Sequence, residues 1–486
     1  MVFSSHLFCF YFLPLSLAVY YLLPRRGKHL GLTLLSYLFY GWANPAFVVL
    51  MLFSTTVDYL CGLAVAGASP FGRDSVAKLE EGGPRNRRQR WALGISIVSN
   101  LSLLGFFKYF NFGVDSWNAT LAALGLGHLA LEGVLRVTLP LGISFYTFQS
   151  MSYTFDVYRG RCAALRNAVD FACYVSMFPQ LVAGPILRFS EVADQLRHRV
   201  HSVSKVARGL TFFCFGMAKK VLLANPCGRV ADAAFGADVL GPLEAWYGAV
   251  AYAFQIYFDF SGYSDMAIGL GLMFGFVFPK NFDGPYRARS ITEFWRRWHL
   301  SLSRWLRDYL YIPLGGNRLG PRRTYVNLMI VMLLGGLWHG AAWNFVVWGA
   351  LHGGLLALER HRRDALKRPA GRWVDLRRTV TTFFWVLLSW VFFRAADLGD
   401  AVAYLGHMVG LGADDPRSAL VAGLFYRPYD LAMMGIAAAV VWGAPQTWDF
   451  TRRLTPWKVG LGLVFLWISL VAMETQGYNP FIYFIF

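Results

Sequence analysis

The sequence predicts an all-α, polytopic integral membrane protein with roughly 10–13 transmembrane or re-entrant helices. Composition is the first reason: 56% of the 486 residues are hydrophobic and only 15% are charged, whereas soluble domains carry about 25% charged residues. The second reason is that several apolar runs reach the ~20 residues that a helix needs to cross a bilayer. No soluble domain or linker interrupts them, so residues 1–486 are predicted to form one membrane domain.

Positive charge gathers between the apolar runs and predicts the topology. The formal net charge is +18, and Lys and Arg clusters between apolar runs are typical of cytoplasmic loops. The first cluster, Arg25–Lys28, places the N-terminus in the periplasm, and the acidic stretch at Asp414 and Asp415 belongs to the same side. The C-terminus is also predicted to be periplasmic. No nucleic-acid-binding motif accompanies the positive charge, so we expect no nucleic-acid partner.

The elements follow in chain order. The apolar runs cover about 6–24, 30–43, 46–67, 91–112, 137–157, 166–187, 209–224, 245–277, 326–358, 379–395, 430–447 and 457–474. Residues 113–135 lack Lys and Arg and are predicted to be external or interfacial. Pro and Gly break the run 166–187, which predicts a re-entrant segment. The run 326–358 is too long for one crossing, so we expect two helical pieces that meet near His339.

His339 lies in the middle of the apolar stretch "LLGGLWHGAAWNFVVWG", residues 333–349. Ionisable residues in membrane segments usually face a cavity and often mark a substrate path. Imidazole also titrates near neutral pH, which suits a general base. Trp338 can wall a pocket around it, and Asn344 offers an amide partner. The alternative is a core histidine whose nitrogens are satisfied by a carbonyl.

A second stretch, "ITEFWRRWHLSLSRWLRDYLYIPLGGNR" at residues 291–318, has apolar residues at helical spacing and arginines on the other faces. This pattern predicts one amphipathic helix at the membrane interface. His299 is flanked by its apolar stripe, with Trp298 beside it. The helix either anchors the chain at the surface or brings His299 to the cavity of His339, with Arg304 among the arginines that meet donor phosphates. These two interpretations are compatible.

A third stretch, residues 255–276, places two carboxylates in an apolar run. Asp259 and Asp265 are costly there unless they are paired or near water. Ser261 and Tyr263 lie between them. The two carboxylates either pair with structural partners, such as the arginine-rich helix, or line the path of the acceptor, where Ser261 and Tyr263 would also bind substrate. Gly269, Gly271 and Gly275 resemble a nucleotide loop only weakly, because no strand precedes them, and close helix packing is favoured.

Several catalytic signatures are absent from the sequence. It has no P-loop, no H-E-x-x-H, no G-x-S-x-G and no Cys/His metal cluster. We therefore expect no metal and no permanently bound cofactor. Chemistry through histidine and a pre-activated donor remains open.

Taken together, these stretches resemble the membrane-bound O-acyltransferase (MBOAT) family, and within it the bacterial branch of alginate O-acetylation membrane proteins. The resemblance spans nearly the whole chain. It is carried by "MVFSSHLF", "LPLGISFYTFQSMSYTFDVYRG", "FPQLVAGPILRF", "YFDFSGYSDMAIGLGLMFGF", "SITEFWRRWHLSLSRWLRDYLYIPLGGNR", "MLLGGLWHGAAWNFVVWGALHG" and "NPFIYFIF". Many eukaryotic members carry Asn where this chain has His299.

The resemblance implies helices arranged around a central funnel or tunnel, a catalytic core over about 137–360 and C-terminal helices over about 379–475. It implies that His339 and His299 are the catalytic residues. It further implies an enzyme of the bacterial inner membrane that takes acetyl from cytoplasmic acetyl-CoA. Periplasmic acceptor or transferase proteins would then complete the O-acetylation of an exported polysaccharide such as alginate.

Other functions remain as alternatives. Within the family, D-alanyl or another acyl group can be transferred to a cell-envelope polymer from a carrier-protein thioester. Outside acyl transfer, broken helices and buried Asp residues would also suit a non-catalytic acyl or glycan transporter. A scaffold for a secretion complex is a third class. The transporter and the scaffold both predict that alanine at His339 leaves acyl transfer unaffected.

Overall fold

The computed structural model describes residues 1–42, 44–72, 76–182, 184–362, 371–411, 423, 425–475 and 477–480, which are helical with no strand among them. They fall into two compact units, Met1–Ser202 with Gly271–Phe278 and Val203–Leu270 with Pro279–Phe486. The all-α class is confirmed. The single membrane domain and its central tunnel stay predictions. Asp414, Asp415 and the last six residues lie outside the described ranges.

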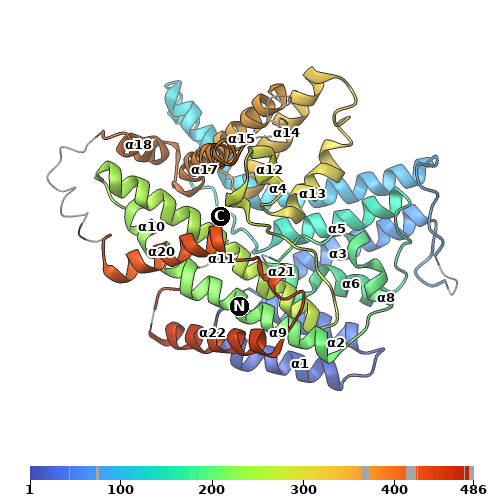
Figure 1. The fold of residues 1–486 in the computed structure, drawn as a ribbon. Coiled ribbons are helices and arrows are strands. Elements are labelled where there is room, and N and C mark those ends of the chain that lie inside the picture. The colour runs from blue at the N-terminus through green and yellow to red at the C-terminus, as the bar shows by residue number, and fades with distance from the viewer. Residues whose placement is uncertain are drawn as a thin grey trace. The chain divides into compact units, whose positions relative to one another are not determined.

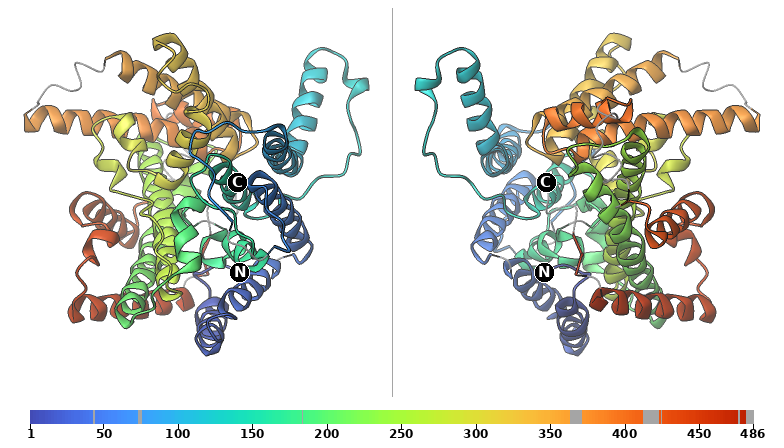
Figure 2. Two further views of the ribbon diagram at one scale, coloured as in Figure 1. Left: turned by 90° about the vertical axis from the view of Figure 1, so that its right-hand side faces the viewer. Right: turned by 90° about the vertical axis from the view of Figure 1, so that its left-hand side faces the viewer.

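The first unit is built from the N-terminal helices. In chain order they are η1 (Leu7–Phe12), α1 (Leu13–Leu22), α2 (Lys28–Gly41), α3 (Ala46–Ala66), α4 (Arg87–Ala123), η2 (Gly127–Leu129), α5 (Ile143–Tyr158), α6 (Ala168–Ser176), α7 (Phe178–Leu181) and α8 (Phe189–Arg197). Helices α3, α4 and α5 pack against one another (Figure 2). The run 166–187 is broken into α6 and α7, as its Pro and Gly predict.

The second unit holds the predicted site. In chain order its helices are α9 (Val203–Ala218), η3 (Lys219–Ala224), α10 (Asn225–Phe235), α11 (Pro242–Met273, whose last turn belongs to the first unit), η4 (Pro285–Arg287), α12 (Ile291–Trp295), α13 (Leu300–Leu306), η5 (Arg307–Tyr311), α14 (Pro321–His339), α15 (Trp343–His361), α17 (Arg372–Arg394), α18 (Leu398–Met408), α20 (Pro428–Gly443), α21 (Thr447–Phe450) and α22 (Pro456–Thr475). Helix α22 lies along α9, and α14 lies along α15 (Figure 1).

Glycines allow α9 and α11 to cross with their backbones in contact. A Cβ added to Gly216 would lie 2.5 Å from the carbonyl oxygen of Gly262, and one added to Gly269 would lie 2.5 Å from that of Gly209. Small residues allow this close approach between membrane helices. Gly269 therefore serves helix packing, as the sequence favours, and not a nucleotide loop.

Three helices in the described part of the chain are long and apolar enough to cross a membrane. They are α3, α4 and α22, and shorter apolar helices cover Leu7–Leu22 and Pro428–Gly443. Together with the helical fold, they agree with a membrane protein. The periplasmic position of the two termini stays a prediction.

The expected helix end near residue 112 is wrong. Helix α4 continues from Arg87 to Ala123, through the first half of the segment that was predicted to be external. No proline interrupts this part, and the helix ends just before Gly125, whose φ of +74° is left-handed. The chain then folds back, and Arg136 forms a two-bond ion pair with Asp115 of α4, at 2.7 and 2.8 Å.

Candidate active site

His339 is the last residue of α14, at the closed end of a tight helical hairpin. The run 326–358 divides here into α14 and α15, as predicted. A Cβ on Gly336 would lie 2.2 Å from the carbonyl oxygen of Phe345, and one on Gly349 would lie 2.4 Å from that of Met332. The glycines thus allow the backbones of α14 and α15 to come into contact, and this contact fixes the position of His339 at the end of α14.

Aromatic rings enclose His339. Its ring centroid lies 5.0 Å from that of Trp338, 5.3 Å from that of Trp348 and 5.1 Å from that of Phe393. Only 8% of its surface is exposed. The imidazole is therefore shielded from solvent by α14, α15 and α17, in a setting where polar interactions are stronger than in water.

The expected single amphipathic helix over 291–318 is wrong, because it breaks at His299. Helix α12 ends at Trp295, and α13 begins at Leu300. His299 has φ 42° and ψ 56° and is the single non-glycine residue with positive φ in the described ranges. A left-handed residue cannot continue a right-handed helix. Because such backbone costs about 1–3 kcal/mol, surrounding contacts must hold it.

Asn281 supplies those contacts and orients the ring of His299. Its Oδ1 accepts from the backbone N–H of Ser301 (3.2 Å) and from the Ser301 hydroxyl (2.9 Å), and lies 3.3 Å from Nδ1 of His299. Its Nδ2 donates to the hydroxyl of Ser264 (2.8 Å). The amide oxygen therefore faces His299, so Nδ1 carries the proton and Nε2 keeps a lone pair.

The free lone pair lies in a fully buried position. His299 is 0% exposed, and its Nε2 has no hydrogen-bond partner among the residues that the structure describes. Burial also lowers the pKa of this imidazole, because removing water disfavours the charged ring. Its ring meets Phe260 of α11 edge-on, with centroids 4.6 Å apart. A neutral ring with an open acceptor can hold a hydroxyl or take its proton.

One indole connects the two histidines. The ring of Trp338 lies 6.1 Å from that of His299 and 5.0 Å from that of His339, centroid to centroid. The structure therefore brings both candidate catalytic residues into contact with one side chain, although 40 positions in the sequence separate them. The structure thus places Trp338 between the two histidines, and its role in a substrate site stays a prediction.

The other predicted site residues near the histidines lie as follows. Trp298 is buried and stacks on Phe294, with centroids 5.6 Å apart. Arg304 is partly buried on α13. Asn344 donates both amide protons to the end of α17, to the carbonyls of Phe392 (3.1 Å) and Ala395 (2.8 Å). Asn344 thus holds the end of α17, which carries Phe393, in place. Because both of its amide protons are used there, it cannot donate a hydrogen bond to His339.

The two carboxylates of α11 have structural partners. Asp259 pairs with Lys220 at 2.7 Å, and both side chains are only 1% exposed. Asp265 pairs with Lys219 at 2.6 Å and accepts from the hydroxyl of Thr447 at 2.7 Å. Ser261 and Tyr263 are buried within the same helix. These contacts favour structural pairing over direct substrate contact for Asp259 and Asp265.

Four polar residues here are not predicted from the sequence: Asn281, Lys219, Lys220 and His352. A signal existed for the two lysines, because they lie inside the apolar run 209–224 and therefore require partners. His352 lies on α15. Its Nδ1 accepts from the indole of Trp295 (3.3 Å), and its Nε2 donates to the hydroxyl of Ser389 (3.1 Å), which itself donates to a carbonyl. His352 is therefore a satisfied core histidine.

Comparison with known proteins identifies the family. Residues 161–395, which include both histidines, match the profile of the membrane-bound O-acyltransferase family. The probable alginate O-acetylase AlgI of Azotobacter vinelandii is 43% identical, and the alignment covers all of both chains. The chain belongs to the membrane-bound O-acyltransferase family. It is accordingly an O-acyltransferase of the membrane.

Further relatives are named for acetyl transfer to alginate or to peptidoglycan. The probable alginate O-acetylase AlgI of Pseudomonas aeruginosa is 49% identical over 82% of this chain and 73% of the relative. The peptidoglycan O-acetyltransferase of Helicobacter pylori is 37% identical over 85% of this chain and 80% of the relative. Both names describe acetyl transfer, and they imply a system that modifies a polysaccharide or glycan.

Proposed function

We propose that this chain is the transmembrane O-acetyltransferase of a polysaccharide-modification system. It takes acetyl from acetyl-CoA on the cytoplasmic side and passes it across the inner membrane. Periplasmic acceptor or transferase proteins then place it on an exported polysaccharide such as alginate. The names of the relatives support the acetyl group and the alginate-type polymer. The basic loops between apolar runs support a cytoplasmic donor side and periplasmic termini.

The observation that carries this proposal is the pair of buried histidines, His299 and His339, whose rings both contact the indole of Trp338. His339 is the base. The acceptor oxygen attacks the thioester carbonyl, so a C–O bond forms and the C–S bond breaks. The hydroxyl proton passes to His339 and then to the departing thiolate, and the products are an acetyl ester and free coenzyme A.

His299 has a different task in this scheme. Because its Nδ1–H is directed at Asn281, its Nε2 can accept a hydrogen bond but cannot donate one to an oxyanion. It therefore holds the acceptor hydroxyl in place beside His339. Trp338, in contact with both rings, sets their spacing, and loss of such positioning is costly to the rate.

The proposal is tested by the release of free coenzyme A from acetyl-CoA. Wild type, His339→Ala, His299→Ala and a matched control, His361→Ala, are purified in nanodiscs with a periplasmic acceptor protein. His361 lies exposed at the end of α15, outside the site. We expect His339→Ala to lose about 10²–10⁴-fold in turnover while donor binding is kept. His361→Ala should match wild type.

Two results would contradict the proposal. If wild type does not release coenzyme A but accepts D-alanyl from a carrier-protein thioester, the donor is a carrier protein. If wild type and His339→Ala release coenzyme A from acetyl-CoA at equal rates, His339 is not the base.

A further inference from the structure

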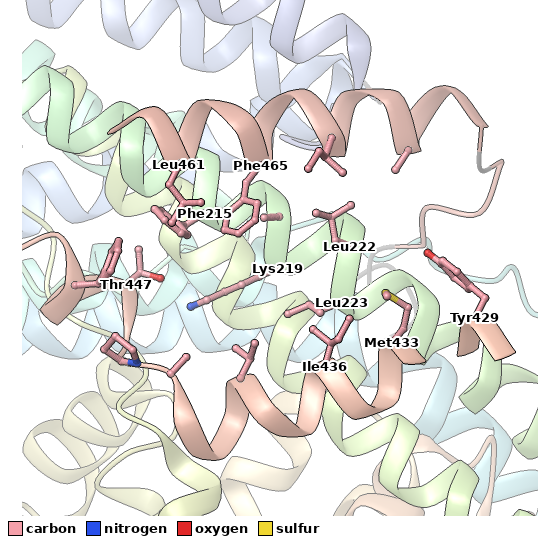
Figure 3. A pocket seen from close by; sticks show the side chains of 17 residues that line it. Phe215, Lys219, Leu222, Leu223, Tyr429, Met433, Ile436, Thr447, Leu461 and Phe465 are labelled. Carbon is pink, nitrogen blue, oxygen red and sulfur yellow. The ribbon is translucent and has the colours of Figure 1, made fainter. Parts of the chain in front are cut away.

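A cavity lies in the second unit, away from the two histidines, and is formed by α9, η3, α20, α21 and α22. It is a groove of about 590 Å³ with 17 lining residues. Helices α20 and α22 form its two sides, and Lys219 and Leu222 lie between them (Figure 3). Of the lining residues, only Lys219, Thr447 and Tyr429 carry polar side-chain atoms.

The inner polar groups of this groove are already satisfied. The amine of Lys219 and the hydroxyl of Thr447 both donate to one carboxylate oxygen, Oδ2 of Asp265, at 2.6 and 2.7 Å. The pair of opposite charges cancels, and neither group requires a polar ligand. Large apolar side chains such as Ile436 and Phe465 make up the rest of the wall. The occupant of the groove is therefore apolar.

Positive charge gathers at one end of the groove. Four cations, which we call the basic cluster, lie around α21 and the start of α22: Arg208, Arg452, Arg453 and Lys458. The amine of Lys458 lies 4.6 Å from the ring centroid of Phe450, which lines the groove. The guanidinium of Arg208 lies 5.2 Å from the ring centroid of Trp448. The neighbouring acid, Asp449, is paired with Lys280 (2.7 Å), so the cluster keeps its charge.

The other end of the groove, at Tyr429, has no comparable cluster of cations among the described residues. Arg229 beside Tyr429 is paired with Asp430 at 3.4 Å. Along α20, the groove extends from Tyr429 to Ala444, which is roughly 22 Å of helix. One leaflet of a bilayer has a hydrocarbon depth of about 15 Å. The groove is therefore long enough for one acyl chain of a leaflet, and the positive charge at one end matches an anionic head group.

We propose that the groove binds an anionic phospholipid, with an acyl chain between α20 and α22 and its phosphate at the basic cluster. Helix α22 supports a lipid-facing position, because it is long and apolar enough to cross the membrane and only 11% of its apolar window is buried. Trp457, 59% exposed beside the cluster, is typical of the membrane interface. A partner helix fits less well, because helix packing in membranes favours small residues and this wall is lined by large ones.

The lipid site also adjoins the histidine site through α11. Asp265, which fixes two groups of the groove wall, follows Ser264, and the hydroxyl of Ser264 accepts from the amide that orients His299. A lipid that fills the groove therefore supports the helix on which the tautomer of His299 depends. In this proposal the lipid acts as a structural ligand of the enzyme, and it is not the acyl donor or acceptor.

The test counts retained lipid and does not depend on acyl transfer. Purified full-length protein in detergent is given equal amounts of phosphatidylglycerol and phosphatidylcholine, and bound lipid is counted by native mass spectrometry. We expect wild type to retain several-fold more phosphatidylglycerol. Ile436→Trp, which fills the groove, should lower retention at least fivefold. Leu431→Trp is the matched control, because Leu431 lies on the same helix, is exposed to the same extent (44% against 46%) and does not line the groove.

Further variants test the binding of the lipid's acyl chain and the binding of its head group separately. Ile468→Trp on α22 fills the groove from the other side, with Val464→Trp as its control, and replaces Ile436→Trp if that variant does not fold. The double variant Arg453→Gln/Lys458→Gln should abolish the preference for phosphatidylglycerol. Equal retention by the groove-filling and control variants would overturn the proposal. Equal retention of the two lipids by wild type would overturn the anionic head group, and a co-purifying partner helix in place of lipid would overturn the occupant.

Discussion

At the residue scale, His299 has a left-handed backbone conformation, which is unfavourable for a residue with a side chain unless surrounding contacts stabilise it. Its φ of 42° suits His, Asn and Asp far better than a β-branched residue. His299→Asn should therefore keep the turn while it removes Nε2, and His299→Val should lose about 1–3 kcal/mol more in stability. Thermal unfolding in detergent measures the difference. Equal stability of the two variants would show that the turn is not strained.

A second prediction concerns the buried pair of Lys220 and Asp259, in which both side chains are 1% exposed. Lys220→Met removes the cation of this buried pair while the carboxylate stays buried, and should destabilise the protein by about 3–5 kcal/mol. The double variant Lys220→Met/Asp259→Leu removes both charges and should recover much of that loss. Denaturant unfolding of the single and double variants measures the coupling. As a control, Arg136→Met breaks an exposed pair and should leave the midpoint unchanged.

Residue types could be predicted from the sequence, but their partners could not. His339, His299 and Trp338 stand out because polar or aromatic groups are conspicuous in apolar stretches, and the structure brings all three together. The role of Asn281 depends on a contact with residue 299 across a turn, and the pairing of Lys220 with Asp259 crosses two helices. Neither contact leaves a periodic signal, so sequence spacing does not reveal it.

At the element scale, the hairpin of α14 and α15 depends on glycine at Gly336. A Cβ there would lie 2.2 Å from the carbonyl oxygen of Phe345, so Gly336→Ala must push the two helices apart. We expect at least a tenfold loss of acyl transfer, because His339 lies three residues further along α14. Gly354→Ala on α15 is the control, since no atom lies within 4 Å of its added Cβ. It should be neutral or slightly stabilising. Coenzyme A release and thermal midpoints are compared, and equal activity of the two variants would contradict the packing argument.

Element boundaries were predictable where a residue breaks the helix by itself. Glycines divide the run 326–358 at the expected place, and Pro179 accompanies the break between α6 and α7. The break at His299 was not predictable, because the residues from Trp298 to Trp305 keep the helical spacing of apolar side chains, and only the tertiary contact with Asn281 reverses the backbone. The continuation of α4 to Ala123 was not predictable from hydropathy. The apolar run ends near residue 112, but a change to polar residues does not by itself end a helix.

At the scale of the whole molecule, composition and apolar runs predicted the fold class, because lipid requires every backbone group to be satisfied within helices. The topology follows from charge, and α4 offers the clearest test of it. Its 37 residues extend roughly 55 Å, well beyond the ~30 Å hydrocarbon core. The basic loop before α4 and the segment after it that lacks Lys and Arg should therefore lie on opposite sides of the membrane.

Cysteine labelling in intact spheroplasts tests this arrangement in a variant without its six native cysteines. Glu81→Cys and His128→Cys flank α4, and both positions are exposed. A membrane-impermeant maleimide should label His128→Cys in intact spheroplasts and Glu81→Cys only after lysis, because the arginine-rich loop faces the cytoplasm. The reverse pattern would invert the topology and place the donor side at the other face. Labelling of both positions in intact spheroplasts would show that α4 does not cross the membrane.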